Sequence, residues 1–352
     1  MSAVKRIGVA GAGLIGRKHI ELIEASPNCV VAGIADPSAE AKAFAATNHF
    51  PWYPDLRELL ERERPDGTIV ASPNAMHPTM ALDCIERGVP ALIEKPVTDT
   101  AVAAQRLHQA VQRSGVPVLV GHHRRHNPVI TAVREAIAGG RIGQLTAVAG
   151  LWLLKKPDDY FDVAWRREQG GGPVLINLVH DIDCLRFICG EIVEVQASTS
   201  NKVRGFGVED TAALLLKFAN GAIGTVTMSD ATPAPWSWEL SSGENRAYPR
   251  QDQPCYFFAG TKGSLAVPTM QLWSYPGQDG WYAPLTQTEL AAVSFDPLVE
   301  QLRHFLAVIA GRENPLVSVE DAAGTLAVVE AICEAARTGA RVSPGHIMEQ
   351  NA

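Results

Sequence analysis

Residues 6–36 read RIGVAGAGLIGRKHIELIEASPNCVVAGIAD, and this stretch decides the fold of the first part of the chain. A short apolar run, residues 6–10, leads directly into a GxGxxG segment at residues 11–16, and a stretch with helical spacing of apolar side chains follows. A second apolar run, residues 30–35, ends at Asp36. The order strand, glycine loop, helix, strand and acid predicts the opening unit of a dinucleotide-binding sheet.

The glycine loop offers a place for phosphate groups. Gly11 permits a tight turn, Gly13 lets the backbone approach a pyrophosphate, and Gly16 lets the helix pack closely on the strand. The amides at the helix start, at Leu14 and Ile15, would meet the phosphates with the positive end of the helix dipole. GxGxxG alone is a weak signal, and a glycine turn with a capping aspartate is the alternative. The elements in register around the loop favour a nucleotide.

The acid that ends the second run indicates which dinucleotide binds. Asp36 lies twenty residues after Gly16, where a carboxylate accepts hydrogen bonds from a ribose hydroxyl. A carboxylate there would repel the 2′-phosphate of NADP, and neither Pro37 nor Ser38 supplies a compensating cation. The sequence therefore predicts NAD, with NADP disfavoured.

The pattern of apolar residues differs between the two parts of the chain. Up to residue 121, short apolar runs alternate with helical stretches, which predicts an α/β Rossmann domain over residues 1–121 with a doubly wound parallel sheet. Beyond it, β-rich runs are joined by tight turns such as Asn220-Gly221, and one strong helix is expected over 173–189. These features predict an α+β domain over residues 122–352. One face of its sheet would remain exposed in a monomer. Burial of that face against another copy of the chain favours a homodimer or homotetramer.

The composition narrows the class of protein further. A length of 352 residues suits two domains, and the net charge of −7 argues against nucleic acid or an anionic membrane as the main partner. The six cysteines form no CxxC pair, which favours a reduced, cytoplasmic protein. The N-terminal residues do not resemble a signal peptide, and no apolar run reaches membrane-spanning length. We expect a small-molecule partner.

Polar side chains follow two later strands of the predicted parallel sheet. Ser72, Asn74 and His77 come after one apolar run, and Glu94-Lys95-Pro96 follows the next. Ligands gather beyond the carboxyl ends of the strands in such sheets. Asn74 and His77 could equally be turn and cap residues. Lys95 is poorly explained as a solvated charge and is a candidate for proton transfer, with a structural Lys–Glu pair as the alternative.

A third polar group lies on the helix expected over residues 173–189. Three glycines, residues 170–172, precede Pro173 and would let a ligand or a neighbouring backbone approach the helix start closely. Asn177 and His180 are three residues apart on an otherwise apolar helix. Unpaired buried polar groups cost on the order of a few kcal/mol each, so these two are candidate site residues. His180 could instead be a core histidine whose hydrogen bonds are satisfied.

A cluster of histidines raises the alternative of a metal site. His122, His123 and His126 are close in sequence, but HHxxH is not a familiar ligand spacing. Arg124 and Arg125 would repel a cation. The sequence therefore predicts no metal.

Taken in this order, these signals resemble the Gfo/Idh/MocA family, named after glucose–fructose oxidoreductase, inositol dehydrogenase and rhizopine catabolism. The likeness covers almost the whole chain, and Glu-Lys-Pro together with the glycine-led helix and its histidine is its most specific part. The residues that carry it are Gly11–Gly16, Asp36, Ser72-Pro73-Asn74 with His77, Glu94-Lys95-Pro96, Trp165-Arg166, residues 170–183, the hairpin from Glu209 through Asn220-Gly221, and the turn at 260–263.

The resemblance implies a Rossmann domain followed by a domain with a large, mainly antiparallel sheet that often forms dimer or tetramer contacts. It implies oxidation of a secondary hydroxyl of a sugar, an inositol or a related cyclic polyol, with Lys95 beside the nicotinamide and His180 as the proton acceptor. The Lys-Pro peptide is commonly cis in that family. The candidate cofactor-binding residues are Gly11, Gly13, Leu14, Ile15, Gly16, Asp36, Ser72, Asn74, His77, Glu94, Lys95, Trp165 and Arg166.

Asn177 departs from the family's dehydrogenases that carry an aspartate one turn before the histidine. An amide takes no proton at neutral pH, although it can bind a substrate hydroxyl or orient His180. Lys95 and His180 must then converge on one nicotinamide ring and carry the chemistry, with Asn177 as the third candidate catalytic residue. The candidate substrate-binding residues are Lys95, Arg124, Trp152, Tyr160, Asn177, His180 and Asp183, of which the aromatic ones could equally belong to the core.

Other functions of the same fold remain open at this point. One is an NAD-dependent glycosidase that oxidises and re-reduces its substrate with a bound cofactor. A second is a dihydrodiol dehydrogenase. A third is a non-catalytic sensor of NAD and a sugar, which the presence of Lys95 and His180 disfavours.

Overall fold

The computed structural model describes residues 4–291 and 295–349, and the chain divides into two compact units. The units are the described parts of Met1–His126 with Pro297–Leu326, and of Asn127–Asp296 with Ala327–Ala352. The predicted domains 1–121 and 122–352 differ from this division mainly because residues 297–326 return to the first unit. No local pattern in residues 297–326 predicts that return.

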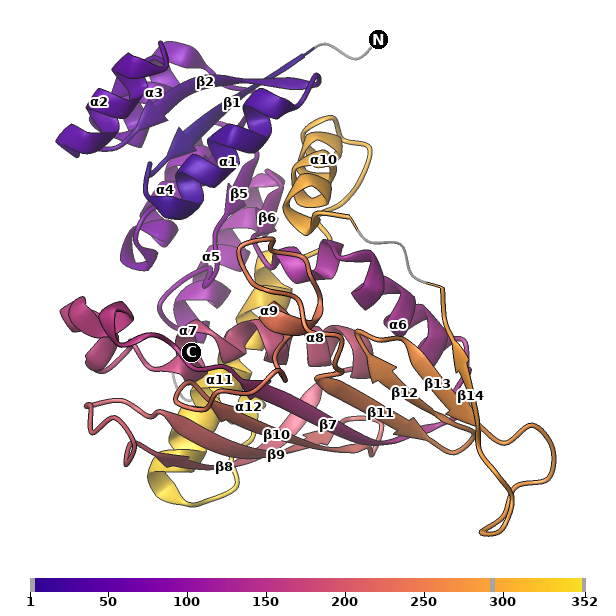
Figure 1. Cartoon of the computed structure of the whole chain (residues 1–352). Coiled ribbons are helices and arrows are strands. Elements are labelled where there is room, and N and C mark those ends of the chain that lie inside the picture. The colour runs from indigo at the N-terminus through magenta and orange to yellow at the C-terminus, as the bar shows by residue number, and fades with distance from the viewer. Residues whose placement is uncertain (1–3, 292–294, 350–352) are drawn as a thin grey trace. The chain divides into compact units, whose positions relative to one another are not determined.

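The first unit is built on a six-stranded parallel sheet with the order β3-β2-β1-β4-β5-β6 (Figure 1). This topology confirms the predicted Rossmann fold. The four middle strands are almost wholly buried, as expected for a sheet covered on both faces. The strands are β1 (Lys5–Ala10), β2 (Cys29–Ala35), β3 (Trp52–Tyr53), β4 (Gly67–Val70), β5 (Ala91–Ile93) and β6 (Val118–Val120). The helices are α1 (Leu14–Ala25), α2 (Ala39–Thr47), α3 (Leu56–Glu63), α4 (His77–Glu86), α5 (Ala101–Ser114) and α10 (Pro297–Ile309), with 3-10 turns η1 (Asn74–Met76) and η2 (His123–His126).

The second unit contains an eight-stranded sheet with the order β14-β13-β12-β11-β7-β10-β9-β8. Only β7 and β10 pair in parallel, so the prediction of a mainly antiparallel sheet is confirmed. Helices α6 and α8 lie over one face of it (Figure 1). The strands are β7 (Leu145–Leu153), β8 (Ile192–Ser200), β9 (Thr211–Phe218), β10 (Ile223–Ser229), β11 (Tyr256–Gly260), β12 (Ser264–Val267), β13 (Gln271–Ser274) and β14 (Thr286–Glu289). The helices are α6 (Pro128–Ala138), α7 (Pro173–Ile176), α8 (Leu178–Cys189), α9 (Trp238–Ser241) and α12 (Pro344–Glu349), with 3-10 turns η3 (Asp158–Asp162) and η4 (Ala164–Arg167), while α11 (Val319–Thr338) contains the division after Leu326.

The helix expected over residues 173–189 is interrupted. It consists of α7 and α8, and Asn177, with φ −112° and ψ −55°, both ends the first and begins the second. The backbone amide of His180 donates to the carbonyl of Asn177 at 3.1 Å, which restarts the helical hydrogen bonding. The break therefore falls on one of the two polar residues that the sequence singled out.

Over residues 4–291 and 295–349, no helix has both the length and the apolar character that a membrane span requires.

Candidate functional site

The glycine loop between β1 and α1 is sterically restricted to glycine at two positions. Gly11 has a φ of +91°, and a Cβ added there would lie 2.6 Å from the carbonyl oxygen of Ala71. A Cβ on Gly16 would lie 2.0 Å from the carbonyl oxygen of Gly11. Both contacts are far below van der Waals distance. The first and third glycines therefore allow the loop to pass β4 and the helix to pack on the loop, as the spacing predicted.

The middle glycine faces open space. A Cβ on Gly13 would meet no heavy atom within 4 Å. Gly13 precedes α1 without a side-chain cap, and Leu14 at the helix start is 94% exposed. The first amides of α1 therefore have no side-chain acceptor, and a bound anion can supply one.

A shielded hydroxyl lies on the loop that follows the neighbouring strand. The Ser72 Oγ is enclosed and forms no hydrogen bond with any residue that the structure describes. Ser72 adjoins Ala71, whose carbonyl group packs against Gly11. This orphaned hydroxyl, together with the open space at Gly13, fits the phosphate groups of a dinucleotide.

Asp36 at the end of β2 is hydrogen-bonded to the glycine loop. Its Oδ2 accepts the amide of Ala12 and its Oδ1 accepts the amide of Ser38, both at 2.8 Å. Burial by itself would raise the pKa of Asp36, but these hydrogen bonds and the nearby charge of Arg17 hold the pKa below its usual value. The carboxylate is therefore ionised at neutral pH, and each oxygen keeps a lone pair for a ribose hydroxyl.

One cation close to Asp36 was missed by the sequence analysis, which examined only residues 37 and 38. Arg17, on the first turn of α1, donates from Nε to the carbonyl of Ala12 at 2.9 Å. Its guanidinium carbon lies 4.7 Å from the centre of the Phe44 ring. Helical periodicity alone could have placed Arg17 on the turn after Gly16, but not its approach to Asp36.

The loops after β4 and β5 are joined by His77. The imidazole is 1% exposed, with Nδ1 2.8 Å from the carbonyl oxygen of Pro96 and Nε2 2.9 Å from that of Ser72. The Lys95–Pro96 peptide is cis, as the resemblance implied. The predicted cofactor contact of the His77 side chain disagrees with this geometry, because both ring nitrogens are already engaged by main-chain oxygens. His77 instead positions the loop that carries Lys95.

Glu94 likewise has a partner that the sequence did not suggest. Its carboxylate is buried against His19 of α1, with Nε2 and Oε1 2.8 Å apart, and its other oxygen accepts the amide of Lys95 at 3.3 Å. Burial would raise the pKa of Glu94, yet the hydrogen bond from His19 keeps it lowered. Glu94 therefore fixes the backbone at Lys95. The sequence predicted a contact between Glu94 and the cofactor, and the burial of the carboxylate disfavours that contact.

In the second unit, a glutamate from the β8–β9 connection holds the start of the interrupted helix. Glu209 Oε1 accepts the amide of Val174 at 2.8 Å. A Cβ on Gly172 would lie 2.5 Å from that carboxylate, which explains the glycine before Pro173. Burial raises the pKa of Glu209. Gly172 therefore admits a neighbouring side chain to the helix start, whereas a Cβ on Gly171 would lie 2.1 Å from the carbonyl oxygen of Trp165, the close approach of a backbone that the sequence allowed.

Beside the helix break lies a lysine that the sequence analysis did not select. The Lys156 Nζ donates to Asn177 Oδ1 at 2.7 Å and lies 3.5 Å from Asp230 Oδ2. Lys156 is 7% exposed, and burial lowers its pKa, which Asp230 opposes only in part. Asn177 and His180 are both half-buried. The second unit thus brings an amide, an imidazole and an ammonium group to one short stretch of structure.

Three further predicted residues lie together near Lys156. The guanidinium carbon of Arg166 is 4.0 Å from the centre of the Tyr160 ring and 5.6 Å from that of Trp165, and its Nη1 donates to the carbonyl of Tyr160. The Lys156 Nζ is 4.8 Å from the same Tyr160 ring. Burial raises the pKa of the Tyr160 phenol. Trp165 remains half exposed, so its predicted cofactor contact is sterically open.

Three other candidates lie in buried surroundings. Trp152 is fully buried and donates from Nε1 to Glu239 at 3.0 Å, which is the core role that the sequence left open for it. Asp183 is 1% exposed and Arg124 is 3% exposed. Their burial disfavours the substrate contact expected for them, because each side chain is already covered by protein.

The histidine cluster does not form a metal centre in the residues that the structure describes, where no three His, Cys, Asp or Glu side chains come together suitably. The ring centre of His126 lies 5.2 Å from that of His304. Burial and the neighbouring His304 lower the pKa of His126 to about 3. A neutral His126 is therefore packed inside the first unit.

This fold and this glycine cradle define an NAD-binding oxidoreductase. The model of the NAD-binding Rossmann fold of the oxidoreductase family matches residues 5–122, and that of the Gfo/Idh/MocA C-terminal domain matches residues 130–266. The chain belongs to the Gfo/Idh/MocA family.

Several relatives have names that state an activity. The chain is 30% identical to an inositol 2-dehydrogenase of Rubrobacter xylanophilus over 227 residues, 62% of this chain and 63% of the relative. It is 28% identical to a 1,5-anhydro-D-fructose reductase of Ensifer adhaerens over 352 residues, 96% and 97% of the two chains. A solved structure of the WlbA dehydrogenase from Bordetella pertussis, in complex with NADH and UDP-GlcNAcA, superposes with a TM-score of 0.77 at 25% identity, covering 97% and 98%.

Proposed function

We propose that this protein is an NAD-dependent dehydrogenase that oxidises a secondary hydroxyl of a sugar, an inositol or a related cyclic polyol. The observation that carries the proposal is the half-buried pair Asn177 and His180 at the break between α7 and α8, in a chain whose first unit has an NAD cradle. Relatives named for inositol and anhydro-sugar substrates support the substrate class.

In this proposal the glycine loop and Asp36 hold the dinucleotide, whose nicotinamide supplies the hydride acceptor when bound. His180 takes the proton of the substrate hydroxyl. Its Nδ1 is enclosed by protein, so we assign Nε2 as the ring nitrogen that takes the proton from the substrate hydroxyl. An imidazole titrates near neutral pH and suits this role. Lys95, held by His77 and Glu94, donates a hydrogen bond to the same substrate oxygen and stabilises its developing negative charge.

The test is to follow NADH absorbance with the purified protein across sugars, inositols, sugar lactones and dihydrodiols, with NAD and NADP in parallel. Net NADH formation from a cyclic polyol is the expected result. Bond cleavage without net NADH, by a protein that retains its cofactor through purification, would instead identify a glycosidase. Turnover of a dihydrodiol alone would move the substrate class to aromatic diols.

Asp36 is expected to set the preference for NAD over NADP. Replacing Asp36 with alanine removes the acceptors for the ribose hydroxyl and leaves the nearby charge of Arg17 unopposed. We expect about tenfold weaker NADH binding, the loss of roughly one hydrogen bond, together with tighter NADPH binding. Fluorescence titration gives both dissociation constants. Asp66→Ala is the matched control, because Asp66 precedes β4 at the amino end of the sheet. An unchanged ratio of the two constants in Asp36→Ala would show that the preference has another origin.

We also propose that the chain forms a homodimer or homotetramer through the sheet of the second unit. Leu215, Thr225, Ala149 and Phe257 are neighbours in register across β9, β10, β7 and β11. Leu215 is 39% and Phe257 40% exposed, so a row with apolar side chains at Leu215, Ala149 and Phe257 crosses four strands on one face of the sheet.

Replacing both Leu215 and Phe257 with lysine is expected to dissociate the assembly to the 37.8 kDa chain. Light scattering after gel filtration measures the mass. Val203→Lys, at a loop residue that is 70% exposed, is the control and should keep the wild-type mass. A wild-type protein that is already monomeric would contradict the proposal.

A further inference from the structure

Lys156 is held in a fixed position on the segment after β7. Its Nζ lies 2.7 Å from Asn177 Oδ1 and 3.5 Å from Asp230 Oδ2. Asp230 is 1% exposed and is itself bound by Arg204, whose Nε is 3.0 Å from Oδ1. A buried ammonium group held by two partners cannot turn freely, so the surrounding protein keeps it against Asn177.

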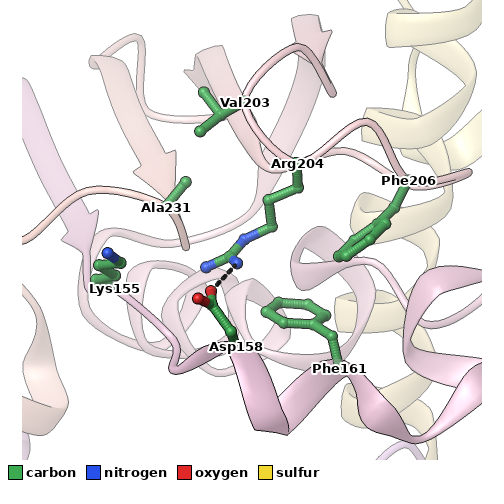
Figure 2. A pocket seen from close by; sticks show the side chains of 7 residues that line it. All are labelled: Lys155, Asp158, Phe161, Val203, Arg204, Phe206 and Ala231. Carbon is green, nitrogen blue, oxygen red and sulfur yellow. Dashed lines mark ion pairs between the residues drawn. The ribbon is translucent and has the colours of Figure 1, made fainter.

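The main chain around Lys156 is fastened as well. Arg204 donates from Nη2 to the carbonyl of Lys156 at 3.0 Å and to that of Asp230 at 2.7 Å. Figure 2 shows the same guanidinium reaching Asp158, with Nη1 and Oδ1 3.5 Å apart, across a pocket of about 320 Å³. The Arg204 guanidinium carbon also lies 4.2 Å from the centre of the Phe161 ring. The lysine is thus anchored at its backbone and at its ammonium group.

This anchoring decides which way the Asn177 amide points. An ammonium group has only hydrogen-bond donors, so the atom that faces Lys156 must be the oxygen of the amide. The Nδ2 group is therefore directed elsewhere, and it forms no hydrogen bond within the described residues. Asn177 is half-buried and lies one turn before His180. The protein consequently presents a hydrogen-bond donor, the Nδ2 group of Asn177, beside His180.

We propose that Lys156 is a positioning residue that makes Asn177 a donor-only specificity residue, so that the substrate carries an acceptor-only oxygen, a carbonyl or a carboxylate, on a carbon near the one whose hydroxyl is oxidised. The inference rests on the proposed function and narrows its substrate class. A hydroxyl can donate or accept, but a carbonyl or carboxylate oxygen can only accept. An aspartate at position 177 would repel such an oxygen, whereas an amide with a buried ammonium behind it attracts it.

The test measures equilibrium binding to the full chain in complexes that cannot react. D-Glucuronate is compared with D-glucose in the presence of NADH, and 2-keto-myo-inositol is compared with myo-inositol in the presence of 1,4,5,6-tetrahydro-NAD, an analogue that neither gives nor accepts a hydride. We expect the acceptor-bearing member of at least one pair to bind about tenfold more tightly or better, the effect of one hydrogen bond to a charged or strongly accepting group. A preference within the first pair would identify a carboxylate as the acceptor group that Asn177 binds, and a preference within the second pair would identify a carbonyl.

Three variants separate positioning from stability. Asn177→Asp should reverse the preference, because the carboxylate pairs with Lys156 and repels the acceptor oxygen. Lys156→Met frees the amide to rotate and should reduce the preference to about threefold or less. Lys155→Met, at the exposed neighbouring lysine, should keep the wild-type ratio. Thermal unfolding of each variant reports folding independently.

The inference is overturned if neither pair shows a preference in the wild type. It is also overturned if Asn177→Asp and Lys156→Met weaken both members of a pair by the same factor, which is the signature of a purely structural role. A wild-type protein that binds these ligands with the expected ratio but oxidises no polyol would contradict the proposed function, while Lys156 and Asn177 would keep their role in selecting the bound ligand. The two failures are therefore distinguishable.

Discussion

Replacing His180 with alanine is expected to lower kcat/KM for the polyol by about 10²- to 10⁴-fold while the dissociation constant of NADH stays unchanged. We assign the proton to the imidazole because the neighbouring Asn177 is an amide, while the carboxylates of Asp181 and Asp183 on α8 are each only 1% exposed. The nucleotide cradle lies in the first unit and His180 in the second, so removing the ring should spare the cofactor. Steady-state rates and NADH fluorescence titration measure the two quantities.

His346→Ala is the matched control for this experiment. His346 is an exposed histidine on α12 of the second unit, and its removal should change neither rate nor NADH binding. Full turnover by His180→Ala would show that another group takes the proton. A parallel loss of turnover and NADH binding would indicate that the variant has disturbed the fold rather than the proton transfer.

Local patterns were sufficient to predict most of the first unit. The glycine spacing fixes a strand, a turn and a helix within a few residues, and α1 begins at Leu14 as expected. Asn220-Gly221 likewise predicted the β9–β10 hairpin, in which Gly221 has a φ of +91°. These features depend on steric limits of the chain itself, which the sequence contains directly.

The roles of several site residues could not be predicted because they depend on contacts between distant segments. The sequence placed Glu94 and His77 at strand ends, where ligands gather, but the partner of Glu94 is His19, 75 residues away. Lys156 bonds to Asn177 across 21 residues of chain, and nothing in its own neighbourhood predicts that contact. A position at the end of a strand therefore indicates where a site lies. Which residues point into the site and which only support it depends on hydrogen bonds between distant segments.

The interrupted helix shows a related limit. Apolar spacing over residues 173–189 is continuous, because α7 and α8 bury the same kinds of side chain, and it predicted one helix. The break occurs at Asn177, where the side chain bonds to Lys156. Periodicity reports which face is buried and is insensitive to one residue whose backbone departs from helical geometry.

Replacing Gly13 with valine is expected to weaken NADH binding by about 100-fold without lowering the melting temperature. A Cβ added at this position would meet no described heavy atom within 4 Å, and the backbone φ of −73° is ordinary for any residue. The added methyl groups would occupy the space that the pyrophosphate needs beside the first amides of α1. A charge-assisted hydrogen bond contributes about 1.5–3 kcal/mol, so losing even one of them accounts for a change of this size.

Gly16→Val is the matched variant, and the comparison separates the cofactor from the fold. A Cβ at Gly16 would lie 2.0 Å from the carbonyl oxygen of Gly11, so the strand and helix must move apart. Overpacking of this kind costs roughly 1–3 kcal/mol or more, and the melting temperature should fall by several degrees. If Gly13→Val binds NADH like the wild type, the nucleotide does not lie against the loop. If both variants unfold alike, the open space at Gly13 is not the feature that distinguishes the two glycines.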